Sequence, residues 1–178
     1  DLHVKRHSFP TRRSSDLVYA SCGGPMHLLG IWRSTDNGIN WSEIAPAGNG
    51  APGTFSPFSH STTSGQASYD NTISVQRGNP DRILMGGIDI YSWNYNGNWT
   101  QLTQWFYPIQ SSQYAHADQH EQVWDKLGRL YVGNDGGVSY SDDGGINFVP
   151  ANRGYNVTQF YAIGFSAHGD VIGGAQDN

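Results

Sequence analysis

The sequence predicts an all-β protein, organised as part of a β-propeller with about three and a half four-stranded antiparallel blades. Three observations predict it: a turn pattern repeats, short strands recur in groups of four, and the composition disfavours long helices. Of 178 residues, 23 are glycine, 14% are charged and 13% are aromatic, which is typical of chains rich in strands and turns. Because closed propellers have about four to eight blades, we expect a fragment that is truncated at both ends.

The repeated turn reads S-x-D-x-G-x-x-aromatic, at residues 34–41 and again at residues 141–148. In each copy the Asp is expected to accept hydrogen bonds from backbone N–H groups just ahead of it. The Gly is expected to take a positive φ, and the aromatic to open the next strand and pack into the core. We therefore predict a structural role for Ser34, Asp36, Gly38, Trp41, Ser141, Asp143, Gly145 and Phe148. A degenerate third copy at residues 92–99 has Asn94 in place of Asp.

Short strands follow one another along the chain in repeating units. The first unit (18–46) is predicted to hold strands at 18–21, 30–34 and 41–44, with its first strand missing upstream. The second unit (70–103) has strands at 72–76, 82–87, 90–93 and 98–102, and the third (116–150) at 121–125, 129–132, 138–140 and 147–149. The fourth unit (158–178) begins with strands at 160–165 and 171–174.

Two segments are set apart from these units. Residues 1–17 resemble the in-frame translation of a sequencing-library adapter, so we expect a non-native leader outside the fold. Residues 47–69 are polar and lack periodicity, which predicts a surface loop. Without the leader the formal charge moves from −5 to about −7; such an acidic chain is not expected to bind nucleic acid, because it lacks a basic stripe. No apolar run approaches the roughly 18 residues that cross a membrane.

A histidine-rich segment precedes the first strand of the third unit. If residues 114–121 are extended, His116, Asp118 and His120 share one face, because strand side chains alternate. Such a face could bind a divalent metal ion through nitrogen and oxygen ligands, or place a His beside a carboxylate for acid–base chemistry. The alternative is that these side chains only bond to neighbouring turns. No other cofactor is expected.

An Asp also recurs after the second strand of successive units, at Asp89, Asp135 and Asp177. In a propeller these strand ends gather on one face, so the carboxylates could bind a cation or sugar hydroxyls, or act as the acid and base of a glycosidase. Turn capping is the alternative interpretation. Trp105, in the aromatic run before Pro108, is the best candidate for a surface ring that stacks on a ligand.

The turn pattern resembles the Asp-box, or BNR, repeat of sialidases, two-domain xyloglucanases, sortilin-type receptors and secreted bacterial β-propellers. Residues 116–120, 133–138, 159–161 and 173–178 are similar to secreted BNR-repeat propellers of Bacteroidetes-type bacteria. The Arg-Ile-Pro motif and arginine triad of sialidases are not recognisable, and no segment matches the catalytic segments of xyloglucanases.

The resemblance implies a secreted or cell-surface module that binds a polysaccharide or protein ligand through one propeller face. Its alternative is an Asp-box glycoside hydrolase with paired carboxylates among Asp118, Asp135, Asp89 and Asp177. Asp118 and Asp135 are then the catalytic candidates, and His116, His120 and Trp105 line the ligand site. The oligomeric state is left open.

Overall fold

A computed structural model describes residues 3–8, 16–48, 56–59, 63–95, 97–152 and 160–175. The described residues form strands and turns without a helix, which confirms the all-β prediction. They therefore contain no helix that is long and apolar enough to cross a membrane.

The strands occur in groups of four along the chain. The first group is β1 (His3–Ser8), β2 (Val18–Gly23), β3 (Leu28–Ser34) and β4 (Ser42–Gly48). The second is β5 (Thr72–Val75), β6 (Arg82–Gly86), β7 (Ile90–Asn94) and β8 (Trp99–Gln101). The third is β9 (Gln119–Trp124), β10 (Leu130–Asn134), β11 (Gly137–Ser141) and β12 (Val149–Pro150), and the last pair is β13 (Phe160–Phe165) and β14 (Val171–Ala175).

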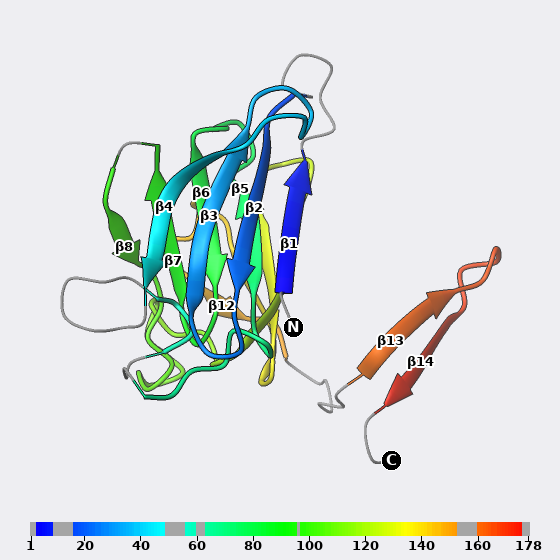
Figure 1. Ribbon diagram of the computed structural model, residues 1–178. Coiled ribbons are helices and arrows are strands. Elements are labelled where there is room, and N and C mark those ends of the chain that lie inside the picture. Colours follow the sequence, from blue (N-terminus) through cyan, green and yellow to red (C-terminus); the bar gives the residue numbers. More distant parts are fainter. Residues whose placement is uncertain are drawn as a thin grey trace.

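Each group of four is a separate antiparallel sheet in which sequential strands are neighbours, and β13 and β14 form a two-stranded hairpin. The sheets meet through their first strands, because β5 contacts β1 and β2 on one side and β9 on the other. Figure 1 shows the sheets stacked one behind another. Repeated four-stranded meanders that meet along their first strands are the arrangement of propeller blades. The chain is therefore a partial β-propeller, as its sequence predicts.

The first sheet differs from the expectation in one strand. Residues 3–8 were expected to lie outside the fold, yet they form β1, paired in register with β2 from His3 opposite Gly23 to Ser8 opposite Val18. The strand predicted to be missing upstream is thus supplied by the segment 1–17 itself. Whether that segment is a foreign leader stays a prediction, because pairing with β2 uses backbone groups that any sequence offers.

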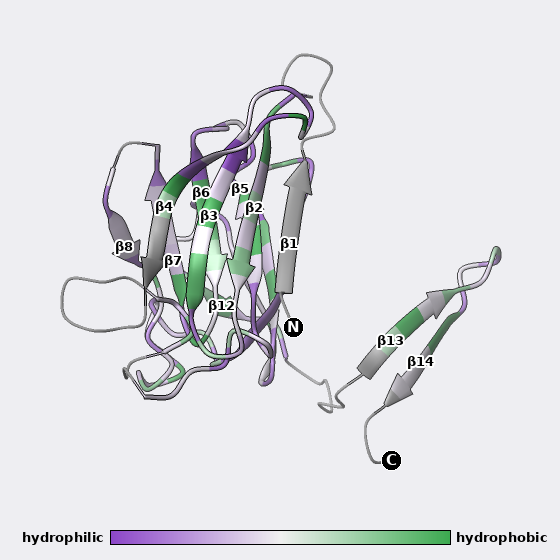
Figure 2. Cartoon of the chain, in the orientation of Figure 1, coloured by the Kyte–Doolittle hydropathy of each residue, from purple (hydrophilic) through white to green (hydrophobic). Residues whose placement is uncertain are grey.

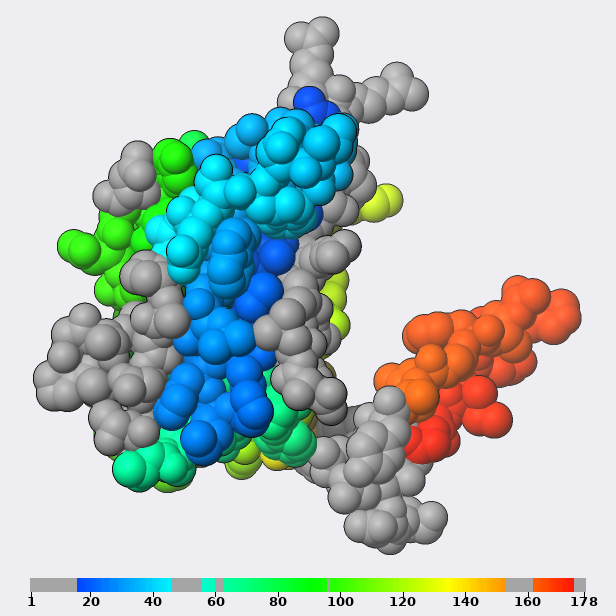
Figure 3. Space-filling view, in the orientation of Figure 1, coloured from blue at the N-terminus to red at the C-terminus, as the bar shows by residue number. Residues whose placement is uncertain are grey.

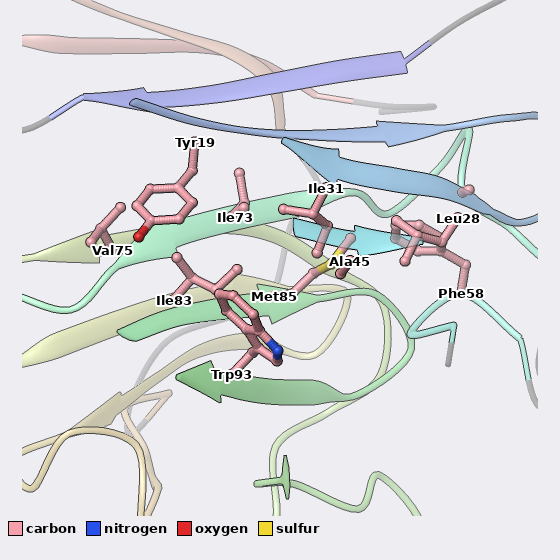
Figure 4. Close-up of a cluster of buried hydrophobic side chains, with 11 residues drawn as sticks. Tyr19, Leu28, Ile31, Ala45, Phe58, Ile73, Val75, Ile83, Met85 and Trp93 are labelled. Carbon is pink, nitrogen blue, oxygen red and sulfur yellow. The ribbon is translucent and has the colours of Figure 1, made fainter. Parts of the chain in front are cut away.

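Side chains from the first two sheets pack into one hydrophobic core (Figure 4), which includes Tyr19, Leu28, Ile31, Ala45, Phe58, Ala67, Ile73, Val75, Ile83, Met85 and Trp93. Phe58 and Ala67 are fully buried although they belong to the predicted surface loop. That prediction is wrong for these two residues. A polar, aperiodic segment can still place single apolar side chains in a core. A periodic hydrophobic pattern does not reveal such isolated residues.

A second core lies between the second and third sheets, made of Leu84, Ile90, Leu102, Ala115, Leu130, Val132 and Phe148. Beside it, buried polar side chains join the first strands of these sheets. Gln122 accepts a hydrogen bond from Ser74 Oγ (2.7 Å) and donates one to Thr72 Oγ1 (2.9 Å), and Trp124 Nε1 donates to Ser74 Oγ (3.1 Å). Because buried polar groups must be paired, this network fixes how the two blades meet.

The two predicted turns have one geometry. In the first, Ser34 Oγ accepts from Gly38 N (2.8 Å) and Asp36 Oδ1 from Asn40 N (2.8 Å). In the second, Ser141 Oγ accepts from Gly145 N (2.8 Å) and Asp143 Oδ1 from Asn147 N (2.9 Å).

Both glycines of these turns have positive φ, 85° at Gly38 and 89° at Gly145, as the turn requires. Phe148 enters the second core as predicted. Trp41 is only half-buried, and its Nε1 donates back to Gly38 O (2.9 Å). The aromatic thus closes the first turn over itself instead of filling a core.

The β13–β14 hairpin stands apart from the three sheets (Figures 1 and 3). Its apolar residues (green in Figure 2) are largely exposed, with Phe165 at 76% and Ile172 at 77%. Its two strands pair with each other, and within the described part of the chain no third strand joins them.

Alternating strand directions give the sheets two different ends. The loops after the second and fourth strands, and those before the first, lie at one end, which we call the loop end. The turns between first and second strands and between third and fourth strands lie at the opposite, turn end. Both Ser-Asp turns, which follow β3 and β11, are therefore at the turn end.

Candidate functional site

Polar side chains from three segments of the second and third blades converge at the loop end. They come from the turn 66–70 before β5, from the start of β9 together with the residue before it, and from the β10–β11 loop. The group consists of Gln66, Tyr69, Asp70, Asp118, His120 and Asp135. Asp118, His120 and Asp135 were predicted from the sequence, whereas the three residues of the turn 66–70 were not.

The turn 66–70 is closed by its own backbone. Gln66 O accepts hydrogen bonds from Tyr69 N (2.8 Å) and Asp70 N (3.1 Å), and Gln66 N donates to Phe58 O (3.1 Å). Within the turn, Ala67 and Asp70 are fully buried while Tyr69 is 48% exposed. This alternation anchors the turn in the first core and leaves the side chains of Gln66 and Tyr69 directed at the third blade.

Two carboxyl groups share one amide nitrogen. Gln66 Nε2 donates one hydrogen bond to Asp70 Oδ2 (2.8 Å) and a second, short one to Asp118 Oδ1. The two carboxyl oxygens are therefore no farther apart than about 6 Å, twice the length of an N–H···O bond. A primary amide nitrogen has two protons, so this donor is fully used.

Both carboxyl groups are hard to ionise. Burial raises the pKa of Asp70 from 3.8 to about 8, with the charge of Asp118 adding to the effect and the Gln66 hydrogen bond opposing it. Asp70 Oδ1 is buried and has no hydrogen-bond partner, so a charge on this carboxyl group would be only partly compensated, by the Gln66 hydrogen bond to Oδ2. Burial also raises the pKa of Asp118, against the hydrogen bond from Gln66 and with the charge of Asp135.

The third carboxyl group, that of Asp135, contacts both a His and a Tyr side chain. His120 Nε2 lies 2.6 Å from Asp135 Oδ1, and Tyr69 OH donates to Asp135 Oδ2 at 2.9 Å. The Tyr69 and His120 rings meet edge to face with centroids 4.8 Å apart. The side chains of His120 and Asp135 are 35% and 28% exposed. This trio offers a hydrogen-bonding surface to a ligand at the loop end.

The extended face that would have made a metal site is not formed. Asp118 has a positive φ of 65°, so the chain turns there. His120 is the extra residue of a bulge, because Gly133 pairs with Glu121 and Asn134 with Gln119. A bulge re-aims the side chain it carries.

The three expected ligands consequently diverge. Asp118 bonds to Gln66, His120 contacts Asp135, and His116 Nδ1 lies against Ala117 O (3.1 Å). Within the described ranges, no group of three or more His, Cys, Asp or Glu side chains has the arrangement of a metal site. His116 instead covers Gly136, where a Cβ atom would overlap the imidazole.

The remaining predicted residues lie elsewhere. Asp89 is fully buried and accepts hydrogen bonds from Thr103 Oγ1 (3.1 Å), Trp105 N (2.9 Å) and Gln101 Nε2 (3.2 Å), so it caps the loop after β8. These hydrogen bonds are of the kind that the turn-capping alternative expects. Trp105 is 47% exposed, with its ring edge-to-face against Phe106 at 5.9 Å. Asp177 lies outside the described residues.

Comparison with known proteins places these features against solved folds. No protein-family profile and no curated protein matches the chain. Among solved structures, YCF48 bound to D1 peptide aligns at 17% identity with a TM-score of 0.48, over 92% of this chain and 46% of that one. An ancestral GH74 enzyme aligns at 16% identity with a TM-score of 0.49, over 96% of this chain and 21% of that one. The chain thus spans less than half the length of either, and its fold assignment depends on the sheet topology given above.

Proposed function

We propose that this chain is part of a secreted β-propeller that binds a glycan through the loop end. The observation that carries the proposal is the convergence of Tyr69, Asp118, His120 and Asp135 from three segments of the chain, each side chain still partly exposed. Carboxylates accept hydrogen bonds, and Tyr and His both donate and accept them. Such a mixed set suits the hydroxyl groups of a polysaccharide.

Two further features support a glycan over other ligands. The paired Ser-Asp turns have the geometry that the Asp-box resemblance implies, and many Asp-box propellers act on or bind glycans. Trp105 and Phe106 are also exposed, in a loop that Asp89 anchors through Trp105 N, and aromatic rings can stack on sugars through their apolar faces. A protein ligand is the competing partner.

The test is calorimetric titration of the recombinant chain with the β-glucan cellotetraose and with sialyllactose. We expect saturable binding to one of them, weakened about tenfold or more by Asp135→Asn, because a hydrogen bond to a charged group contributes about 1.5–3 kcal/mol. The matched control is Asp142→Asn at the turn end, whose exposed ion pair with Arg129 (2.6 Å) is remote from the loop end. Absence of heat with both sugars, or equal loss in the control, contradicts glycan binding at this face.

A second candidate function, glycoside hydrolysis, is favoured by one observation. Burial raises the pKa of Asp118, and the nearby Asp135 raises it further. Asp135 itself contacts His120. Two carboxyl groups whose environments differ in this way are the pattern of a general acid and its partner. Asp70 is too buried to touch a substrate. Release of reducing sugar from β-glucan that disappears in Asp118→Asn would establish hydrolysis; no turnover by the wild type rules it out for that substrate.

A further inference from the structure

Side chains of the turn 66–70 donate hydrogen bonds to Asp118 and Asp135 at the loop end. We propose that Gln66 and Asp70 are positioning residues for Asp118: Gln66 holds the Asp118 carboxylate by its hydrogen bond, and this hold depends on Asp70 carrying a proton. As a statement about a ligand site, this inference rests on the proposed function. The contacts between Gln66, Asp70 and Asp118 do not depend on that function.

The geometry leaves Gln66 little freedom. Its backbone is tied to Phe58 O and to the N–H groups of Tyr69 and Asp70. Its two amide protons are directed at Asp70 and Asp118. Because the fixed amide bonds to both carboxyl groups, it holds them close together, so a charge that develops on one acts on the other by Coulomb repulsion.

Asp118 is held in an unusual place. Its φ of 65° is uncommon for a residue other than glycine, and its N–H donates to Ile88 O (3.2 Å). Residues in sparsely populated backbone regions persist where their surroundings over-determine them. The backbone hydrogen bond from Asp118 and that from Gln119 N to Gly87 O (2.8 Å) hold this segment, and the hydrogen bond from Gln66 adds a side-chain contact.

The proton on Asp70 follows from what surrounds it. Asp70 is fully buried, Oδ1 has no partner, and the groups that act on it electrostatically are Asp118 and Asp135, both carboxyls. Two histidines, His120 and His116, act electrostatically on Asp118 and oppose the effect of Asp135 on its pKa. Ionised Asp70 would add a second negative charge beside Asp118, and like charges at hydrogen-bond separations repel strongly in a buried setting. Asp118 would then leave Gln66.

The test reads carboxyl carbons directly by NMR, so it needs no ligand. We expect the Asp70 signal to titrate near pH 8 and the Asp118 signal to show a second inflection at the same pH. In Asp70→Asn that inflection should vanish while Asp118 keeps its position, since an Asn oxygen still accepts from Gln66. In Gln66→Met the Asp118 pKa should rise, because the hydrogen bond that lowers it is gone.

Three results would overturn the proposal: Asp70 ionised at pH 6, no second inflection of Asp118 in the wild type, or an unchanged Asp118 titration in Gln66→Met. Asp142→Asn is the control, and it should reproduce the wild-type curves. If Gln66→Met fails to fold, the comparison of the Asp118 titration between the wild type and Asp70→Asn still tests the proposal. A parallel titration with cellotetraose should show about tenfold weaker binding at pH 9 than at pH 6, absent in Asp70→Asn. Shared inflections without sugar binding would sustain the positioning role and reject the glycan.

Discussion

At the level of single residues, Asp70 links folding to pH. Its pKa is 3.8 ordinarily and about 8 in the folded chain, so between these values the folded state holds a proton that the unfolded state has released. The free energy of unfolding therefore falls as pH rises through this window, by up to about 1.4 kcal/mol per pH unit for one proton. Below the window both states are protonated, and above it both are ionised.

Substituting Asp70 by Asn should flatten this dependence. Urea unfolding at pH 5, 6, 7 and 8 measures it: the wild type should lose stability toward pH 8 and Asp70→Asn should lose much less. The raised pKa of Asp118 leaves a smaller slope of the same sign. An identical slope in both proteins would mean that Asp70 is ionised in the folded state.

Asp70 was overlooked in the sequence although a signal for it exists. Asp70 lies two residues before β5 and Asp118 lies one residue before β9, so an Asp precedes the first strand in both units. The Asp that recurs after the second strand of each unit indicates Asp135, and the Asp that precedes the first strand indicates Asp70. Gln66 and Tyr69 have no such counterpart. Their role depends on packing between blades, which a local pattern does not encode.

At the level of elements, strands and Ser-Asp turns were predicted well because their causes are local. Alternating or short apolar runs mark strands, and Ser, Asp and Gly at fixed offsets bond within their own turn. The bulge at His120 is not predicted by the sequence pattern, because it arises from the pairing of β9 with β10. Because of this bulge and the positive φ of Asp118, the extended face predicted for His116, Asp118 and His120 is not formed.

The second turn should be the more important of the two for stability. Asp143 accepts hydrogen bonds from Ile146 N (3.0 Å) and Asn147 N (2.9 Å), directly before Phe148, which is 2% exposed in the second core. We expect Asp143→Ala to lower the free energy of unfolding by about 1–3 kcal/mol.

Chemical unfolding of Asp143→Ala, Asp36→Ala and Asp142→Asn side by side checks this order. Asp36→Ala should cost less, since Trp41 covers only its own turn, and Asp142→Asn should stay within about 0.5 kcal/mol because its ion pair is exposed. Equal losses in all three would contradict a specific role for the second turn.

At the level of the whole molecule, three sheets share their cores and the fourth pair of strands does not. Ile163, Phe165, Val171 and Ile172 are each more than half exposed, so the hairpin contributes little to the packed body. Deleting residues 160–175 should leave the thermal unfolding midpoint of the remainder unchanged within about 2 °C, the shift expected from less than 1 kcal/mol. A clear drop in the midpoint would show that the hairpin packs on a blade.

The separation of loop end and turn end offers a practical handle. Leu127, in the β9–β10 turn, is 95% exposed and lies at the turn end with the Ser-Asp turns. A thiol placed there, with Cys22 replaced by Ser, would attach the protein to a sensor chip in a single orientation. Every immobilised molecule would then present Tyr69, His120 and Asp135 to the flowing solution.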